Sequence, residues 1–257
     1  MLRNSKRNGL TFIDVIISVA ILVILFGGIY LVYFSIVDVV NNLELRTLAT
    51  SLLNRQMEVV RNIPYESVGT VGGVPSGIIP QEQVVAMGDV GFKVKTVVRN
   101  IDDLFDGTLS GNPNDTAPAD YKLVELEASC VSCSKFVPLV LTGRVAPKSL
   151  ESASNNGSLF VKAIDGSGLP VSQVDVHVVN ASVTPAIDLS DATNAAGVLQ
   201  LVGVPTSTQG YQIEVSKSGY SSDKTYRVGD PTNPNPVKPH ATVAAQTVTE
   251  ITFSIDR

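Results

Sequence analysis

One uncharged stretch near the N-terminus constrains this chain more than any other feature. It runs from Val15 to Val37, 23 residues without a charged side chain, and a helix of that length spans the roughly 30 Å hydrocarbon core of a bilayer. Acidic residues follow the stretch, whereas the residues before it include three basic ones, Arg3, Lys6 and Arg7. This charge bias predicts that the N-terminus stays in the cytoplasm and that the chain after Val37 is exported.

A cleaved secretory signal peptide is the alternative interpretation of this stretch. The apolar core of a signal peptide is shorter, about 7–15 residues, and ends at a cleavage site of small residues. Here the apolar run continues into Asp38 and the Val-Val-Asn-Asn segment at 39–42 without such a site. We therefore expect a membrane anchor.

Asp14 lies at the start of this apolar stretch. A carboxylate within a membrane span costs roughly 2.5–3.5 kcal/mol on insertion scales, which by default indicates a function. Alternatively, Asp14 lies at the membrane interface, where the N-terminus of a helix favours anions and the cost is small. Its position alone does not decide between the two interpretations.

The segment Lys6-Arg7-Asn8-Gly9-Leu10-Thr11-Phe12-Ile13-Asp14 resembles the leader of type IV pilins and of type II secretion pseudopilins. The resemblance implies that a prepilin peptidase cuts between Gly9 and Leu10, so that residues 1–9 are a leader peptide. It also implies that the new amine of Leu10 is methylated and that Asp14 is the fifth mature residue. Most of the family has Glu in place of Asp14 and Phe or Met in place of Leu10.

An assembly mechanism follows from the same resemblance. The carboxylate of Asp14 on an incoming subunit neutralises the N-terminal amine of its neighbour, because paired charges are tolerated in apolar surroundings where unpaired charges are not. The implied partners are other pilin subunits, the prepilin peptidase, an inner-membrane assembly platform and, before assembly, membrane lipid.

Two consecutive glycines, Gly27 and Gly28, interrupt the apolar stretch. Each costs about 1 kcal/mol relative to Ala within a helix, so the pair is a weak point. Small residues also allow close packing between membrane helices, which is the alternative explanation. In similar pilins a comparable segment loses helical order in the filament, and we favour that role here.

The helix is expected to continue beyond the membrane, over residues 10–62 in total, with residues 15–37 as the membrane-spanning half. Apolar residues recur at spacings of three and four and form one stripe, typical of an amphipathic helix: Leu45, Leu48, Ala49, Leu52, Leu53, Met57 and Val60. Pro64 ends the helix, because it excludes Ile63 from helical geometry. The stripe is expected to pack on a globular head.

Residues 63–148 are predicted to form that head. Four Val-rich segments with alternating polarity are its candidate strands: Gln83–Ala86, Gly91–Asn100, Lys122–Ser129 and Phe136–Arg144. A long helix followed by an antiparallel sheet is similar to the pilin head. The predicted fold class is therefore α+β, with an all-β sandwich to follow.

A segment rich in aspartate lies between the second and third candidate strands, with Asp102, Asp103, Asp106, Asp115 and Asp120. Flexible oxygen-rich loops suit Ca²⁺, which takes six to eight oxygen ligands, and some pseudopilins hold calcium in a comparable loop. The spacing does not match an EF-hand, and acidic loops are mostly just solvated. We expect no cofactor, with Ca²⁺ as the alternative.

Cys130 and Cys133 lie between the third and fourth candidate strands. If Val131 and Ser132 form a two-residue hairpin turn, the cysteines face each other at about 5.5 Å, within disulfide reach. An oxidising compartment outside the membrane favours the bridge. Free thiols are the second interpretation, and zinc the third, because the two histidines lie far away in sequence.

A polar linker at residues 149–157 precedes a second module at 158–257. Its candidate strands indicate a β-sandwich: Leu159–Ile164, Val174–Val179, Val198–Val202, Tyr211–Lys217 and Val243–Ile255. Three phrases in it, IDGSGLPV from Ile164, TNAAGVL from Thr193 and YQIEVSKSGY from Tyr211, resemble the carboxypeptidase regulatory-like domain. That resemblance implies a seven-stranded transthyretin-like sandwich that acts as a spacer or interaction surface and has no peptidase activity.

Composition narrows the function class further. The formal net charge of −5 provides no basic footprint for nucleic acid. With two His and two Cys, and no catalytic constellation in the sequence, an enzyme is not expected. We interpret the chain as a major, minor or adhesive subunit of a type IV pilus-like filament, inserted in the cytoplasmic membrane and then assembled on the cell surface. The alternatives are a pseudopilin of a secretion or DNA-uptake machine and an unprocessed, membrane-anchored surface protein.

Overall fold

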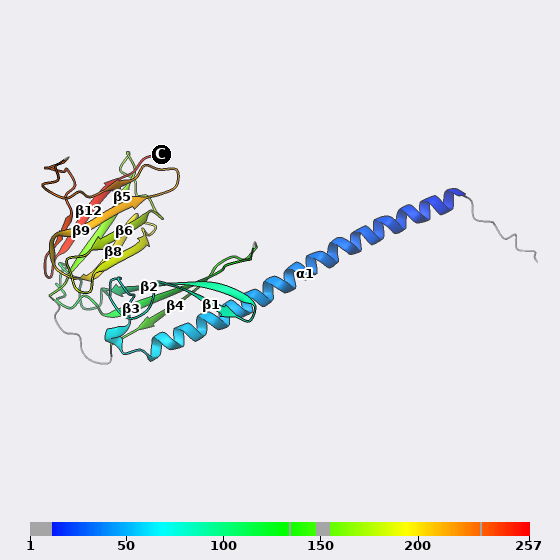
Figure 1. Ribbon diagram of the computed structural model, residues 1–257, viewed down its shortest axis with the longest axis horizontal. Helices are drawn as coiled ribbons and strands as arrows, with labels where there is room; N and C mark the ends of the chain where they lie inside the picture. Colours follow the sequence, from blue (N-terminus) through cyan, green and yellow to red (C-terminus); the bar gives the residue numbers. More distant parts are fainter. Residues whose placement is uncertain (1–11, 134, 148–154, 232) are drawn as a thin grey trace, which may run out of the picture.

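The structure is a computed structural model that describes residues 12–133, 135–147, 155–231 and 233–257. A single 51-residue helix, α1 (Phe12–Asn62), opens the described chain. A short 3₁₀ helix, η1 (Tyr65–Ser67), follows it, and the rest is β-structure. In Figure 1 the C-terminal part of α1 lies along a sheet, while its N-terminal part projects away from both globular parts. The α+β fold class expected from the sequence is confirmed.

The head is a four-stranded antiparallel sheet in the order β1-β2-β3-β4. Its strands are β1 (Glu82–Met87), β2 (Val90–Ile101), β3 (Tyr121–Cys130) and β4 (Leu139–Val145). Side chains alternate between faces, so Phe92 and Val94 on β2 and Val124 and Leu126 on β3 are buried on one face. The opposite face carries charged residues of both signs.

The apolar stripe of α1 covers the buried face of this sheet. Ala49, Leu52, Leu53, Met57 and Val60 are at most 3% exposed and belong to the same hydrophobic cluster as the buried residues of β2 and β3. Their spacing of three and four residues places them on one side of the helix. The helix and the sheet thus form one two-layer core.

Lys122 on β3 ties the segment after α1 to the sheet. Its Nζ atom donates to the carbonyl oxygens of Tyr65, at 2.8 Å, and of Val68, at 2.7 Å. The ammonium also lies 4.5 Å from the centre of the Tyr65 ring. Burial lowers the pKa of Lys122, and the charge of Glu66 opposes this shift. The end of α1 is therefore held in place by a buried side chain.

The second module is a sandwich of two sheets above one end of the head (Figure 1). One sheet has the order β10-β9-β6-β7, with β11 also paired to β9, and the other has the order β12-β5-β8. The strands are β5 (Gly157–Ile164), β6 (Asp175–Asn180), β7 (Ile187–Ala192), β8 (Val198–Val204), β9 (Ser207–Ser216), β10 (Asp223–Lys224), β11 (Ala241–Val243) and β12 (Val248–Ser254). Strand β12 is parallel to β5, and the other pairs are antiparallel.

The sandwich has its own core between the two sheets. Its largest fully buried side chains include Tyr211, Phe253, Leu159 and Ile213. Val74, from the loop before β1 of the head, joins this cluster. A head residue therefore completes the core of the sandwich.

Three local predictions were wrong. Strand β4 begins at Leu139 and not at Phe136, and Pro138 has no N–H to contribute to a ladder. The last pair of β3 and β4 is Ala128 with Leu139, so Val131 and Ser132 are not a two-residue hairpin turn. The single C-terminal strand is divided into β11 and β12 around a turn in which Gln246 has φ of 53°. Strands β7 and β10 were not predicted, because few large apolar residues mark them.

Candidate functional site

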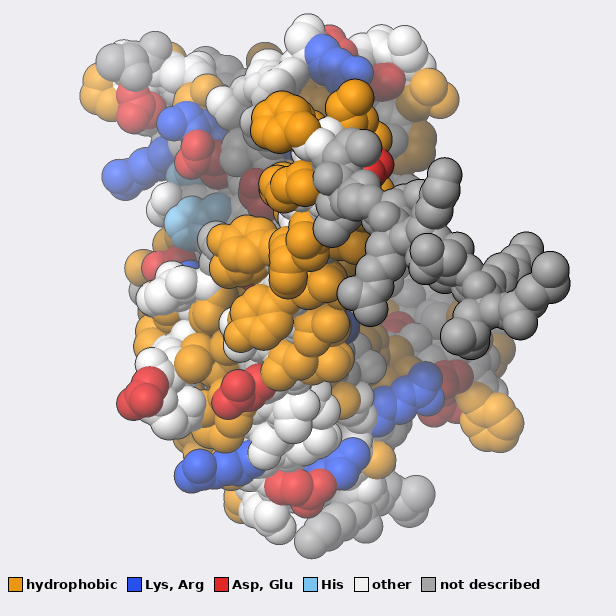
Figure 2. Space-filling model, turned by 90° about the vertical axis from the view of Figure 1, so that its right-hand side faces the viewer, with side chains coloured by type: hydrophobic (Ala, Val, Ile, Leu, Met, Phe, Trp, Pro, Cys, Tyr) orange, Lys and Arg blue, Asp and Glu red, His pale blue; other side chains and the backbone are white. Residues whose placement is uncertain are grey.

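The N-terminal half of α1 is an apolar surface with no covering in the described chain. Every large hydrophobic side chain from Phe12 to Val40 is between 37% and 80% exposed. Within the described residues, α1 is the one helix long and apolar enough to cross a membrane. Figure 2, which views the molecule from the N-terminal end of α1, shows hydrophobic side chains gathered over the helix. An exposed apolar surface of this extent marks a site of contact with a membrane or with other protein surfaces.

Asp14 lies in the first turn of this exposed helix. The Ser18 hydroxyl donates to its backbone carbonyl oxygen at 2.7 Å. An acidic side chain in the first turn interacts favourably with the positive end of the helix dipole. Gly9 and Leu10, the residues of the predicted cleavage, lie outside the described residues.

At Gly27 and Gly28, α1 remains helical. A Cβ atom added at either position would meet nothing within 4 Å. No packing within one chain therefore requires glycine at these positions. The predicted loss of helical order at Gly27 and Gly28 is a prediction about the helix in an assembled filament.

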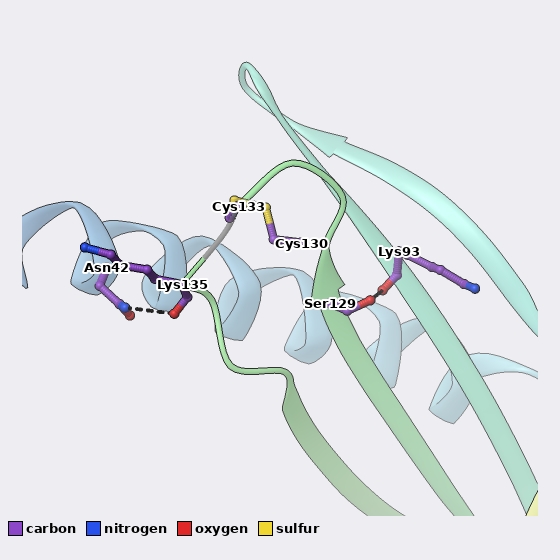
Figure 3. The surroundings of a disulfide bond; sticks show 6 residues. All are labelled: Asn42, Lys93, Ser129, Cys130, Cys133 and Lys135. Atoms are coloured by element: carbon purple, nitrogen blue, oxygen red, sulfur yellow. Dashed lines mark hydrogen bonds between the residues drawn. A yellow bond between two sulfur atoms is a disulfide. The ribbon is translucent and has the colours of Figure 1, made fainter. Parts of the chain in front are cut away.

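Cys130 and Cys133 form a disulfide, with their Cα atoms 5.5 Å apart. The bond closes the start of the β3–β4 connection, which we call the arm (residues 131–138, of which 134 is not described). Figure 3 shows the arm beside α1: the Asn42 amide donates to the Lys135 carbonyl oxygen at 3.5 Å. The Lys135 ammonium lies 2.7 Å from the Asp38 carboxylate. The arm therefore contacts α1 at Asp38 and Asn42, near the C-terminal end of the exposed apolar half of the helix.

The loop between β2 and β3 contains the five predicted aspartates, and several of their carboxylates accept hydrogen bonds from backbone amides of the loop. Asp102 accepts from Leu109 N at 3.0 Å, and Asp115 from Ala117 N at 2.8 Å. Asp120 accepts from Asp103 N, and Asp103 from Phe105 N. These bonds give the loop a defined shape.

Some of these carboxylates have a buried oxygen without a hydrogen-bond partner. Asp102 Oδ1 and Asp115 Oδ2 are buried without a hydrogen-bond partner in the described structure. Burial raises the pKa of Asp102, and the charges of Asp115, Asp120 and Asp106 raise it further, against the hydrogen bond from Leu109. Within the described residues, however, no three His, Cys, Asp or Glu side chains are arranged to hold a metal ion. A cation here would take its other ligands from backbone carbonyls and water.

The head and the sandwich meet at a junction that sequence reasoning missed. Arg99 on β2 donates to both carboxylate oxygens of Asp191 on β7, at 2.9 and 2.7 Å. The Asp191 side chain is only 6% exposed and that of Arg99 28%, and Glu125 lies 3.9 Å from the same guanidinium. Burial lowers the pKa of Arg99, but the hydrogen bond and charge of Asp191, with the charge of Glu125, raise it overall. Bidentate pairs of this kind, between an ionised donor and an ionised acceptor, are stronger than hydrogen bonds between neutral groups.

Hydrogen bonds to backbone carbonyl oxygens complete the junction. The side-chain amide of Asn100 donates to the Val202 carbonyl oxygen of β8 at 2.9 Å. The backbone N–H of Asp188 on β7 donates to the Gly72 carbonyl oxygen at 2.7 Å. The side-chain amide of Gln81 donates to the Asp188 carbonyl oxygen, also at 2.7 Å. Gly203 has φ of +76°, and a Cβ there would lie 2.7 Å from the Asn100 amide nitrogen. The head thus covers parts of the edges of β7 and β8, which would otherwise offer unpaired groups to other chains.

No protein-family model and no curated protein matches the chain. Solved structures with partial similarity include a 3-chlorocatechol 1,2-dioxygenase from Rhodococcus opacus, 13% identical, covering 41% of this chain and 61% of that one, with a TM-score of 0.28. The major pilin subunit BcpA of Bacillus cereus is 12% identical, covering 53% of this chain and 38% of that one, with a TM-score of 0.27. The pilus 2b backbone protein of group B streptococcus is 11% identical, covering 69% of this chain and 98% of that one, also with a TM-score of 0.27. Two of these three are pilus proteins, but at such identities and TM-scores the likeness carries no argument about function.

Proposed function

We propose that this chain is a structural, non-enzymatic subunit of an extracellular type IV pilus-like filament. The observation that carries the proposal is the exposed apolar half of α1, continuous with a half that is buried in the head. Such a helix is stable in a bilayer before assembly and among the apolar helices of other subunits afterwards. The prepilin-like segment before the helix is the site at which a prepilin peptidase cuts the chain, after Gly9.

Export follows from the charges around the helix. The basic N-terminus is retained in the cytoplasm, and the head and sandwich are placed outside. The Cys130–Cys133 disulfide agrees with an oxidising compartment. The neighbours in the filament are other pilin subunits, and the assembly platform of the membrane delivers them. The sandwich, similar to carboxypeptidase regulatory-like domains, is then carried on the outside as an interaction module.

A pseudopilin of a secretion or DNA-uptake machine is the second candidate. It shares the leader and the helix, and filament length and surface detection separate the two. An unprocessed surface protein anchored by α1 is the third candidate, and it differs by retaining residues 1–9.

The first experiment is the intact mass and N-terminal sequence of the protein purified from its native cells. We expect a chain that begins at Leu10 and carries one added methyl group, because the leader resembles the substrate of a prepilin peptidase. A chain that still begins at Met1, in cells with an active prepilin peptidase, would leave the anchored surface protein as the interpretation.

We also propose that the loop between β2 and β3 binds Ca²⁺ in a structural role. Asp115 is 9% exposed, and its Oδ2 has no hydrogen-bond partner. Asp102 Oδ1 is also buried without a hydrogen-bond partner. Burial is the main cause that raises the pKa of Asp102, and the charges of Asp115, Asp120 and Asp106 raise it further; a cation beside these carboxylates would offset that repulsion. Carboxylate oxygens, backbone carbonyls and water together make the ligand set that Ca²⁺ prefers.

Thermal unfolding of the EDTA-treated full chain tests this site. Millimolar CaCl₂ is expected to raise the Tm by a few degrees, as binding that contributes on the order of 1 kcal/mol would. Asp115→Asn should abolish the increase, whereas Asp89→Asn, in the β1–β2 turn, should retain it. MgCl₂ at the same concentration controls for ionic strength. An unchanged Tm with CaCl₂ would show that the loop is only solvated.

A further inference from the structure

The arm lies at the end of the head sheet that faces the exposed half of α1. It follows Cys130, the last residue of β3, and contacts α1 at Asp38 and Asn42. Lys122, near the other end of β3, contacts Tyr65 just beyond the C-terminal end of α1. In Figure 1 the connection between β3 and β4 reaches along α1 toward its N-terminal part. The arm is therefore on the side of the head from which the apolar half of α1 projects.

Several contacts hold the arm in one position and leave two of its valines exposed. The disulfide closes its start, and Lys135 ties it to α1 through both its carbonyl oxygen and its ammonium. The Phe136 ring packs on Phe92 of the head core, with the ring centres 5.7 Å apart. Val131 and Val137 nevertheless remain 59% and 64% exposed. The arm thus presents apolar side chains on a backbone that is fixed to the head and to α1.

The part of α1 beside the arm is also apolar and exposed. Val39 and Leu43 are 55% and 58% exposed. Val39 lies on the same side of the helix as Asn42, three residues later, which contacts the arm. Asp38 separates these residues from the uncharged stretch, and its carboxylate is paired with Lys135. The apolar surface of α1 therefore continues up to the arm, interrupted by a carboxylate whose charge is compensated.

The position of these contacts favours lipid headgroups as the partner. Asp38 directly follows the uncharged stretch, and the helix rises about 6 Å from Asp38 to Asn42. The headgroup region on each side of the hydrocarbon core is roughly 5–8 Å thick. Both contacts of the arm therefore fall within that layer when α1 spans a bilayer. The side chains of Lys135 and Asp38 are 74% and 61% exposed, and a zwitterionic headgroup offers a phosphate to the first and a cation to the second.

We propose that the arm is a lipid-contact surface, which places Val131 and Val137 among the headgroups on the side of the membrane that carries the head. The valine side chains contact the upper part of the acyl chains, while the long side chain of Lys135 reaches a phosphate. This proposal rests on the proposed insertion of α1 and not on filament assembly, because all three candidate proteins insert the helix. The head is then held at the membrane surface by two elements, α1 and the arm.

The chain contains no tryptophan, so single tryptophan substitutions give a site-specific test. Val131→Trp and Val137→Trp report on the arm, and Phe26→Trp reports on the middle of the apolar half of α1. Each full-length variant is reconstituted in phosphatidylcholine vesicles, with or without bromine on the acyl chains near the headgroups. Bromine is expected to quench the emission of both arm variants, because it quenches only on contact. Bromine near the chain ends should instead quench Phe26→Trp more strongly.

Tryptophan itself favours the membrane interface, so a matched valine away from the arm is the control. Val237, in the sandwich, is 97% exposed, and Val237→Trp should emit equally from both kinds of vesicle. Unquenched emission from either arm variant, with Phe26→Trp quenched, would overturn the lipid contact and leave the insertion of α1 intact. Unquenched emission from all variants would overturn both. Quenching of the arm variants that disappears as the protein is diluted with lipid would assign the surface to a second copy of the chain instead.

Discussion

Replacing Asp14 by alanine is expected to leave membrane insertion and cleavage after Gly9 intact and to abolish filaments. In the proposed assembly, the carboxylate of one subunit neutralises the N-terminal amine of its neighbour in apolar surroundings. An amine left there without a counter-charge costs several kcal/mol. The yield of filaments sheared from the cell surface should therefore fall by more than about a hundredfold. Immunoblots of the sheared and membrane fractions, with electron microscopy, measure it.

Asp14→Glu is the matched variant, because it retains the charge and should restore filaments. Ser18→Ala controls for changes to the same helical turn, since Ser18 donates only to the backbone oxygen of Asp14 among the described bonds. If Asp14→Ala cells carried the parental amount of filament, charge pairing would not be the mechanism of assembly.

Arg99→Met is expected to reduce the free energy of unfolding by about 3 kcal/mol, near the lower end for a broken buried ion pair because Arg99 is partly exposed. The substitution leaves the carboxylate of Asp191 buried, with its side chain only 6% exposed. It also removes the bidentate ion pair between the head and the sandwich. Urea unfolding of the full chain measures the loss, and small-angle scattering should show a broader range of head–sandwich distances.

A double variant distinguishes the ion pair from a general loss of packing. Arg99→Met combined with Asp191→Leu should recover most of the lost stability, because replacing both partners removes the isolated charge. Arg144→Met changes an exposed arginine of the head that lies 5.0 Å from the Tyr121 ring, and it should cost less than about 1 kcal/mol. Equal losses from Arg99→Met and Arg144→Met would contradict the role of the junction.

The long helix and the head strands could be predicted because their signals are local. The spacing of Leu52, Leu53 and Met57 defines one side of a helix, and these residues are buried as expected. Alternation of polarity located β2 and β3 to within one residue at each end. Strand β7 has the same alternation, but Asp188, Ser190 and Asp191 make its sequence resemble a loop.

The junction could not be predicted, because its partners are far apart along the chain. Arg99 and Asp191 are separated by 92 residues, and each is an ordinary polar residue of a strand when viewed alone. A weak signal existed in Gly203, which stands where β8 approaches the Asn100 amide. Nothing local relates that glycine to a particular residue of another sheet, so only the folded chain shows the pairing.

The contact of the arm with α1 determines how deeply the helix can enter a bilayer. Lys135 meets Asp38, so the bare part of α1 is the 26 residues from Phe12 to Val37, about 39 Å long at 1.5 Å per residue. This exceeds the hydrocarbon thickness of roughly 30 Å by about 9 Å, which is within the thickness of the headgroup regions. If α1 spans a membrane as proposed, the arm therefore lies close to the headgroups on the side of the head, and it limits how far the helix can enter the bilayer.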